Sequence, residues 1–166
     1  LLAMIDSMAP CARLNALLNK YGINIRQDFL ILNPQDPRAQ LLGQNSAIVS
    51  EFDDFNPVSR DFAKQSQVAL LFQNTRSLEA IEENNAKMKV TLAGKTSDVM
   101  VRVKQISSPD DLKNLTEDRL EEGSFPVIAV AAGKTIDNEK EIRVIVVGSA
   151  QLANNIGARA AENRDM

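Results

Sequence analysis

The stretch EIRVIVVGSAQLANN, residues Glu141–Asn155, decides the fold that we expect for this chain. Its largely β-branched run Ile142–Val147 is typical of a strand that is buried on both faces. Gly148 interrupts the run, and Ser149 can cap a helix that starts at Ala150. A strand, a Gly-Ser corner and a helix start form one unit of an open α/β sheet, in which ligands usually bind at the carboxyl ends of the strands.

Three further apolar runs, Leu1–Ile5, Val68–Phe72 and Val127–Ala131, have the same character. With Ile142–Val147 they predict the central strands of a mixed, mainly parallel α/β sheet with helices on both faces. The polar turn Thr135–Lys140 joins the last two runs, so we expect these two strands to be antiparallel neighbours.

Local signals place the other elements. Leucines and Tyr21 recur at helical spacing from Leu14, and Gly22 follows where a left-handed cap is needed. The remaining expected elements are a strand in Ile23–Leu32, a weak strand at Ala47–Val49, a helix from Asn56-Pro57, a strand at Val90–Leu92, a strand with one wetter face at Val99–Val103, and a short helix opened by Ser108-Pro109.

Composition sets broad limits. The chain has 166 residues, 44% of them hydrophobic, and a net charge of −3, which is typical of one globular domain and gives no reason to expect nucleic acid as a partner. Cys11 is the only cysteine, so the chain can form neither an internal disulfide nor a thiolate cluster. Because Leu1 stands where an initiator methionine would, we expect residues 1–166 to be a single-domain fragment of a longer, membrane-anchored protein.

Catalytic motifs are incomplete. Gly148-Ser149 lacks the extra glycines of a phosphate loop, and a nucleophile elbow needs a base, whereas the chain has no histidine. The string Gly94–Ser97 reads GKTS, but Lys89 occupies the place of the first glycine of a Walker motif. Asp53-Asp54 has no third metal ligand nearby and is interpreted as a pair of loop acids. Cys11 lies near the predicted helix start without a histidine to activate it, and is interpreted as inert.

Four polar residues follow predicted strands or lie close to their ends: Asp6, Asn74, Arg76 and Ser149. Loops after parallel strands converge at one edge of a sheet, so these residues predict a ligand site there, with Arg76 able to hold an anionic group through two hydrogen bonds. Each of the four also has an ordinary explanation as a turn or capping residue. We assign no catalytic residue, no metal site and no cofactor.

Several short segments carry a family resemblance over nearly the whole chain: LLNKYGI (Leu17–Ile23), QDFLILNP (Gln27–Pro34), FNPVSRDF (Phe55–Phe62), VALLF (Val68–Phe72) with Arg76-Ser77 after it, Thr96-Ser97, FPVIAVAA (Phe125–Ala132), RVIVVGSAQLANN (Arg143–Asn155) and Asn163-Arg164-Asp165. Their order resembles the auxiliary component of gliding-motility-type ABC transport systems. These are membrane-tethered proteins with a large extracytoplasmic region.

The resemblance implies an amidotransferase-like or flavodoxin-like α/β sandwich on the extracytoplasmic, periplasmic side of the cytoplasmic membrane. It also implies a transmembrane helix outside this stretch, and an ABC ATPase and a permease as partners. The expected function is therefore a non-enzymatic auxiliary or substrate-recognition module. One alternative is a hydrolase or amidotransferase on the same fold. A second alternative is a cytosolic nucleotide-binding domain, but the absence of glycine-rich loops from the sequence disfavours it.

Overall fold

A computed structural model of the chain describes residues 1–9, 11–65, 69–82, 88–106, 109–113, 115–134 and 141–151. In chain order, the elements of this part are β1 (Leu2–Met4), α1 (Ala12–Asn19), β2 (Ile23–Ile25), β3 (Asp28–Leu32), α2 (Pro37–Leu42), β4 (Ser46–Phe52), α3 (Arg60–Ala63), β5 (Leu70–Gln73), β6 (Leu78–Ala80), β7 (Lys89–Thr96), β8 (Met100–Lys104), the 3-10 turns Pro109–Lys113 and Glu117–Arg119, β9 (Leu120–Gly123), β10 (Pro126–Lys134) and β11 (Glu141–Val147).

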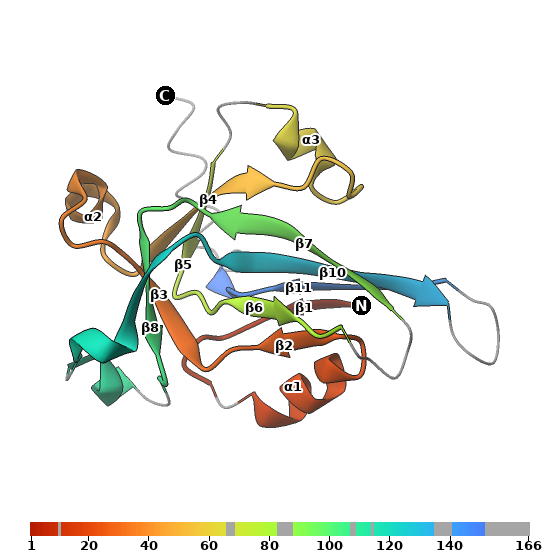
Figure 1. Cartoon of the computed structure of the whole chain (residues 1–166), viewed down its shortest axis with the longest axis horizontal. Helices are drawn as coiled ribbons and strands as arrows, with labels where there is room; N and C mark the ends of the chain where they lie inside the picture. Colours follow the sequence, from red (N-terminus) through yellow and green to blue (C-terminus); the bar gives the residue numbers. More distant parts are fainter. Residues whose placement is uncertain are drawn as a thin grey trace.

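The strands form a curled six-stranded sheet in the order β1-β11-β10-β7-β4-β5, beside a two-stranded sheet β2-β6 and a three-stranded sheet β3-β8-β9 (Figure 1). Strands account for 45% of the structure and helices for 19%, and every described strand pair except β1-β11 is antiparallel. The expected α/β sandwich, with a mainly parallel sheet and helices on both faces, is therefore wrong.

The apolar runs are buried on both faces for a different reason. Ile128 and Val130 of β10 pack into one core cluster with Leu30, Leu32 and other residues of the strands around them. Ala129 and Ala131 of the same strand pack into a second cluster, which includes residues of α1, β2 and β6. One face of the sheet is thus covered mainly by other strands and the other by one short helix with a small sheet, and both coverings exclude water from β10.

Two of the four expected central strands lie inside the six-stranded sheet, and the other two lie at its edges. Val127–Ala131 lies within β10 and Ile142–Val147 within β11, and the two are antiparallel neighbours as predicted, with Ala129 opposite Val146. The runs at Leu1–Ile5 and Val68–Phe72 contribute β1 and β5, but these strands lie at the two edges of the six-stranded sheet rather than at its centre. Val68 itself lies outside the described residues.

Turn chemistry accounts for several boundaries. Gly22 follows α1 with φ 84°, the left-handed conformation that the sequence predicts there. The chain then pairs twice rather than once, because Ile23–Ile25 joins β6 and Asp28–Leu32 joins β8. Pro10, Ser108, Thr135–Lys140 and Leu152–Met166, on which other expectations rest, lie outside the described residues.

Candidate functional site

The parallel strands β1 and β11 end side by side, so the segments that follow them emerge together. Met4 is opposite Val147, and the Ile5 N–H donates a 3.0 Å hydrogen bond to the Val147 carbonyl oxygen. Asp6 and Ser7 follow β1, while Gly148 and Ser149 follow β11. This is the edge at which the sequence places a ligand site.

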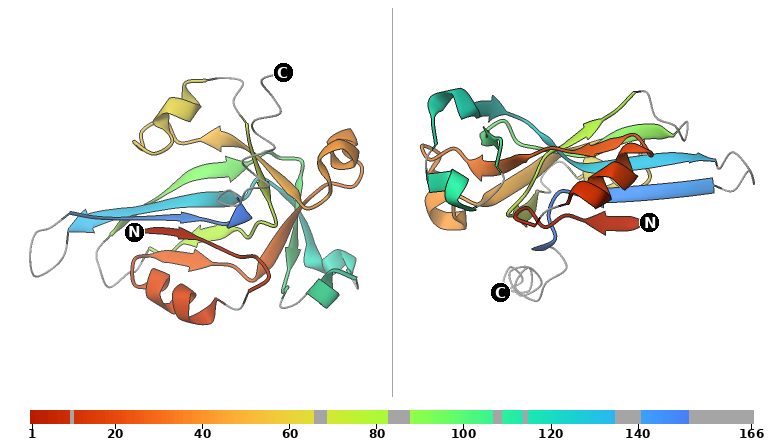
Figure 2. Two further views of the ribbon diagram at one scale, coloured as in Figure 1. Left: turned by 180° about the vertical axis from the view of Figure 1, so that it is seen from behind. Right: turned by 90° about the horizontal axis from the view of Figure 1, so that it is seen from below.

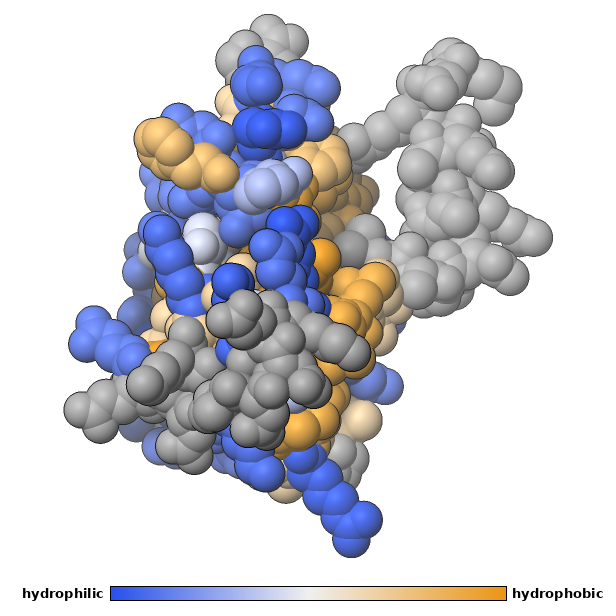
Figure 3. All heavy atoms as spheres, turned by 90° about the vertical axis from the view of Figure 1, so that its right-hand side faces the viewer, coloured by the Kyte–Doolittle hydropathy of each residue, from blue (hydrophilic) through white to orange (hydrophobic). Residues whose placement is uncertain are grey.

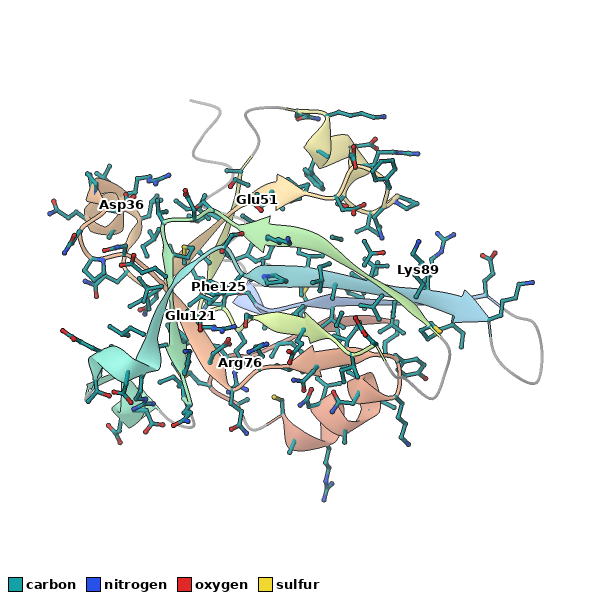
Figure 4. All side chains as sticks on the ribbon, in the orientation of Figure 1. Asp36, Glu51, Arg76, Lys89, Glu121 and Phe125 are labelled. Carbon is teal, nitrogen blue, oxygen red and sulfur yellow. The ribbon has the colours of Figure 1, made fainter. Side chains whose placement is uncertain are left out.

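Arg76 lies inside this junction and not on its surface. Its side chain comes from the connection between β5 and β6 and points into the body of the protein (Figure 4), and the residue is 5% exposed. Nε donates a 2.7 Å hydrogen bond to the Ser7 carbonyl oxygen, and Nη1 lies 3.2 Å from the Cys11 Sγ. The Arg76 backbone N–H donates at 2.9 Å to the Gly148 carbonyl oxygen. Arg76 therefore fastens the end of β1, the start of α1 and the end of β11 to one another.

Gly148 is required by the approach of this same residue. A Cβ placed on Gly148 would lie 2.1 Å from the Arg76 carbonyl oxygen, far inside contact distance and against backbone that cannot swing away. The Gly-Ser corner is therefore a crossing point of two chain segments. This close crossing explains the glycine at position 148 without a bound phosphate or a nucleophile elbow.

Ser149 and Asn74 are also engaged locally. The buried Ser149 hydroxyl donates a 2.5 Å hydrogen bond to the Gln73 carbonyl oxygen and accepts one from the Gln151 N–H. Asn74 adopts φ 48°, a left-handed turn conformation that asparagine tolerates, and its N–H donates to the Asn45 carbonyl oxygen. The turn and capping interpretation thus describes what the two residues do here.

Asp6 alone of the four is exposed, and it lines a cavity. Its Oδ1 accepts a 3.0 Å hydrogen bond from the Met8 N–H. The cavity is a groove of about 590 Å³ lined by residues on both sides of the β1–α1 connection: Met4, Ile5, Asp6, Ala9, Cys11, Ala12, Arg13 and Leu14. Its walls are mostly apolar. The structure therefore gathers Asp6, Arg76 and Ser149 around one junction, but turns them toward different surroundings.

A second, polar cavity of about 600 Å³ has no counterpart in the sequence analysis. It is lined by charged and amide side chains and their neighbours: Asn15, Asn24, Ile25, Arg26, Gln27, Asp28, Glu79, Arg102, Lys104, Gln105 and Glu121. Glu79 accepts from Arg26 at 2.6 Å, and Glu121 lies 2.7 Å from Arg102 and 2.9 Å from Lys104. Figure 4 labels Glu121, which lies on β9. The sequence signal was limited to the wetter face predicted for β8, which is the strand that carries Arg102 and Lys104.

Asp28 is the buried acid of this polar cavity. Burial raises the pKa of its carboxyl above the ordinary value of 3.8, against the opposing effect of hydrogen bonds from the Ser77 hydroxyl and backbone N–H. The Ser77 hydroxyl makes a short hydrogen bond to Asp28 Oδ2. Through its hydrogen bonds to Ser77, the Asp28 carboxyl joins β3 to the β5–β6 connection. Asp28 and Ser77 do not form the arrangement of nucleophile and base that a hydrolase uses.

The other motifs that the sequence analysis considered, Asp53-Asp54 and the GKTS string, have structural roles. Asp53 Oδ1 accepts from the backbone N–H groups of Phe55 and Asn56, so this acid caps a loop. Gly94, Lys95 and Thr96 lie in β7, and Thr96 Oγ1 accepts from the Phe125 N–H, so the first three residues of the GKTS string form strand and not a phosphate loop. No cluster of three or more potential metal ligands occurs within the described ranges.

Comparison of the chain with models of protein families, with curated proteins and with solved structures finds no match. Among the described residues, none of the helices has both the length and the apolar character needed to cross a membrane.

Proposed function

We propose that this chain is a non-enzymatic, extracytoplasmic recognition module of an ABC transport system of the gliding-motility type. The transport part of the proposal rests on the order of the sequence segments that resemble the auxiliary component of such systems. In that arrangement the full-length parent is held at the membrane and associates with an ABC ATPase and a permease. A β-rich fold is compatible with this role, because recognition needs an exposed surface and not a particular sheet topology.

The non-enzymatic part rests on how Arg76 is used. The residue best suited to grip an anionic ligand is buried and donates to the Ser7 carbonyl oxygen instead. The Ser149 hydroxyl, the other reactive group at the same sheet edge, donates to the Gln73 carbonyl oxygen. Both groups hold distant chain segments together, which supports a binding module whose scaffold is fixed by its polar groups.

One contact favours the alternative, a hydrolase or amidotransferase. Cys11 occupies the N-cap position of α1, and Arg76 Nη1 lies 3.2 Å from its Sγ. A nearby cation and a helix N-terminus both stabilise a thiolate, the nucleophile of such enzymes. Acyl transfer also needs a base that shuttles the proton, and the chain has no histidine. We expect a chloroketone analogue of glutamine to label Cys11 no faster than it labels free cysteine; saturable, accelerated labelling would favour the enzyme.

The location of the domain can be tested in intact cells. Protease added to spheroplasts that contain the full-length parent should cleave this domain, because the proposal places it outside the cytoplasmic membrane. A cytoplasmic protein in the same sample should survive until detergent is added. Protection of the domain together with that control, or recovery of the parent in the cytosolic fraction, would contradict the proposal.

A further inference from the structure

We propose that the open edge of β1 and the adjoining groove bind an extended peptide segment of a partner protein, which adds to the six-stranded sheet as a further strand. The segment is apolar at alternate positions and carries one carboxylate that faces Arg13. This inference concerns a surface that adjoins the Arg76 junction, and it stands whether or not the parent belongs to a transport system.

The direction of the backbone groups shows that the edge is open. Among the described residues, β1 is the terminal strand of its sheet and pairs with β11 alone. The Leu1 carbonyl oxygen accepts from the Ile145 N–H at 2.8 Å, and the Ile5 N–H donates to the Val147 carbonyl oxygen. In a parallel pair alternate residues turn their N–H and C=O groups toward the neighbour, so those of Leu2 and Met4 point away from β11. Figure 2 shows β1 at the margin of the described strands in the view from below.

The edge lacks the features by which proteins discourage strand addition. The run Leu1–Ile5 contains no charged side chain, no proline and no bulge. Leu1 is 65% exposed and Leu2 57% exposed. Figure 3 views the molecule from the right-hand side of Figure 1, and an apolar patch lies to the right of the centre of this view. A strand whose outer edge has no charged side chain and no partner among the described residues is suited to pairing with another chain.

The adjoining groove gives room for side chains of the added strand. Its volume of about 590 Å³ lies between the carboxyl half of β1 and the first turn of α1, and Met4, Ala12 and Leu14 line it. Strand addition supplies main-chain hydrogen bonds, while pockets that take alternate side chains supply specificity. The apolar walls select apolar residues at those alternate positions.

Charge decides between a partner peptide and a second copy of this chain. Arg13 lines the groove, is exposed and makes no ion pair with the described residues. The acid on the same wall, Asp6, accepts from the Met8 N–H. A second β1 paired with the first would bring no carboxylate within its Leu1–Ile5 run to Arg13. A partner strand with one acidic residue complements the groove, and this is the occupant to which we commit.

The probe is a capped eight-residue peptide, Thr-Val-Ser-Glu-Thr-Val-Lys-Val, whose glutamate lies on the same face as its valines, titrated into ¹⁵N-labelled protein and followed by NMR. We expect saturable shifts at Leu2, Met4 and Arg13 and slower hydrogen exchange of the Leu2 and Met4 amides. Met4→Pro removes an outward N–H but none of the bonds to β11, and should weaken binding about fivefold to tenfold. Replacing the glutamate of the peptide by glutamine should weaken binding about twofold to fivefold.

Matched controls separate strand addition from nonspecific contact. A peptide with proline in place of its central threonine cannot pair along its length, and should bind at least about tenfold more weakly. The exposed variant Leu41→Thr, on α2, should bind the original peptide unchanged. Equal binding of the proline peptide, shifts confined to other surfaces, or no binding at millimolar concentration would overturn the proposal. A dimer in analytical ultracentrifugation that Met4→Pro dissociates would also overturn it, because the second copy would then be the occupant.

Discussion

The guanidinium of Arg76 donates a hydrogen bond from Nε to the carbonyl oxygen of Ser7, at 2.7 Å and across 69 residues of chain. Because a buried guanidinium must keep its hydrogen bonds, this contact ties the end of β1 to the connection that carries Arg76. The backbone carbonyl of the same residue also lies so close to Gly148 that a Cβ does not fit at position 148. The junction of β1, β11 and the β5–β6 connection is thus the point at which sequence-distant segments are locked together.

Replacing Arg76 should therefore destabilise the protein. We expect Arg76→Ala to lower the free energy of unfolding by about 2–3 kcal/mol, because the Ser7 carbonyl oxygen loses a charged donor and the side chain leaves a cavity. A ligand-gripping Arg76, as the sequence suggests, would leave stability nearly unchanged. Urea unfolding measures the difference. The control is Arg60→Ala, whose side chain is 51% exposed and should cost less than about 0.5 kcal/mol; equal effects of the two variants would refute the buried role.

The crossing of Gly148 over Arg76 predicts a steric effect. Gly148→Ala should lower the free energy of unfolding by more than about 2 kcal/mol, because the new Cβ would lie 2.1 Å from a backbone oxygen. Gly94→Ala is the matched control within the same sheet. Its Cβ would meet side-chain atoms of Ile128, the nearest being Cδ1 at 2.9 Å, instead of a backbone oxygen at 2.1 Å, so we expect a smaller loss. Thermal unfolding of both variants gives the comparison, and a Gly148 variant as stable as the Gly94 variant would disprove the contact.

Asp28 predicts a specific dependence of stability on pH. Burial raises the pKa of this carboxyl in the folded protein above 3.8, its value in the unfolded chain. Between the two pKa values the folded state binds more protons, so the free energy of unfolding contributed by Asp28 falls as pH rises through that window. Asp28→Asn removes the titrating group while keeping an oxygen that can accept from the Ser77 N–H.

The difference between wild type and Asp28→Asn isolates this effect. Other acids titrate in both proteins, including Asp36, whose pKa is lowered to about 2 by its hydrogen bonds to Arg38. Chemical unfolding between pH 3 and pH 7 should show the wild type losing stability relative to the variant as pH rises. A difference that is constant over the range, or that grows in the opposite direction, would show that Asp28 does not have a raised pKa.

Strand positions were predictable from the sequence where an apolar run has β-branched residues on both faces. Val127–Ala131 and Ile142–Val147 satisfy this condition, and both lie in strands. The inference from such a run to helices on both faces failed, because Leu30 and Leu32 of another strand bury one side of β10 as effectively as a helix. A buried run reports that both faces are covered and does not identify the covering element.

The sequence predicted that some of the polar residues after strands lie close together, and it did not predict how they are used. Asp6 and Ser149 lie at one junction because β1 and β11 run parallel, whereas Arg76 reaches it from the β5–β6 connection. Whether Arg76 faces a cavity or the Ser7 carbonyl oxygen depends on the path of the β5–β6 connection, which no local pattern encodes. The polar cavity escaped prediction for a similar reason, since Glu79 and Glu121 reach it from strands far apart in the sequence.

Co-purification of the full-length parent from detergent-solubilised membranes tests the central claim most directly. The parent, tagged at the end away from this domain, should retain an ABC ATPase and a permease in near-stoichiometric amounts, as quantified by mass spectrometry. An unrelated membrane protein with the same tag, purified in parallel, sets the background. Recovery of both transporter subunits well above that background is the predicted result. A parent that is solubilised and intact but brings down neither subunit would contradict the proposed function.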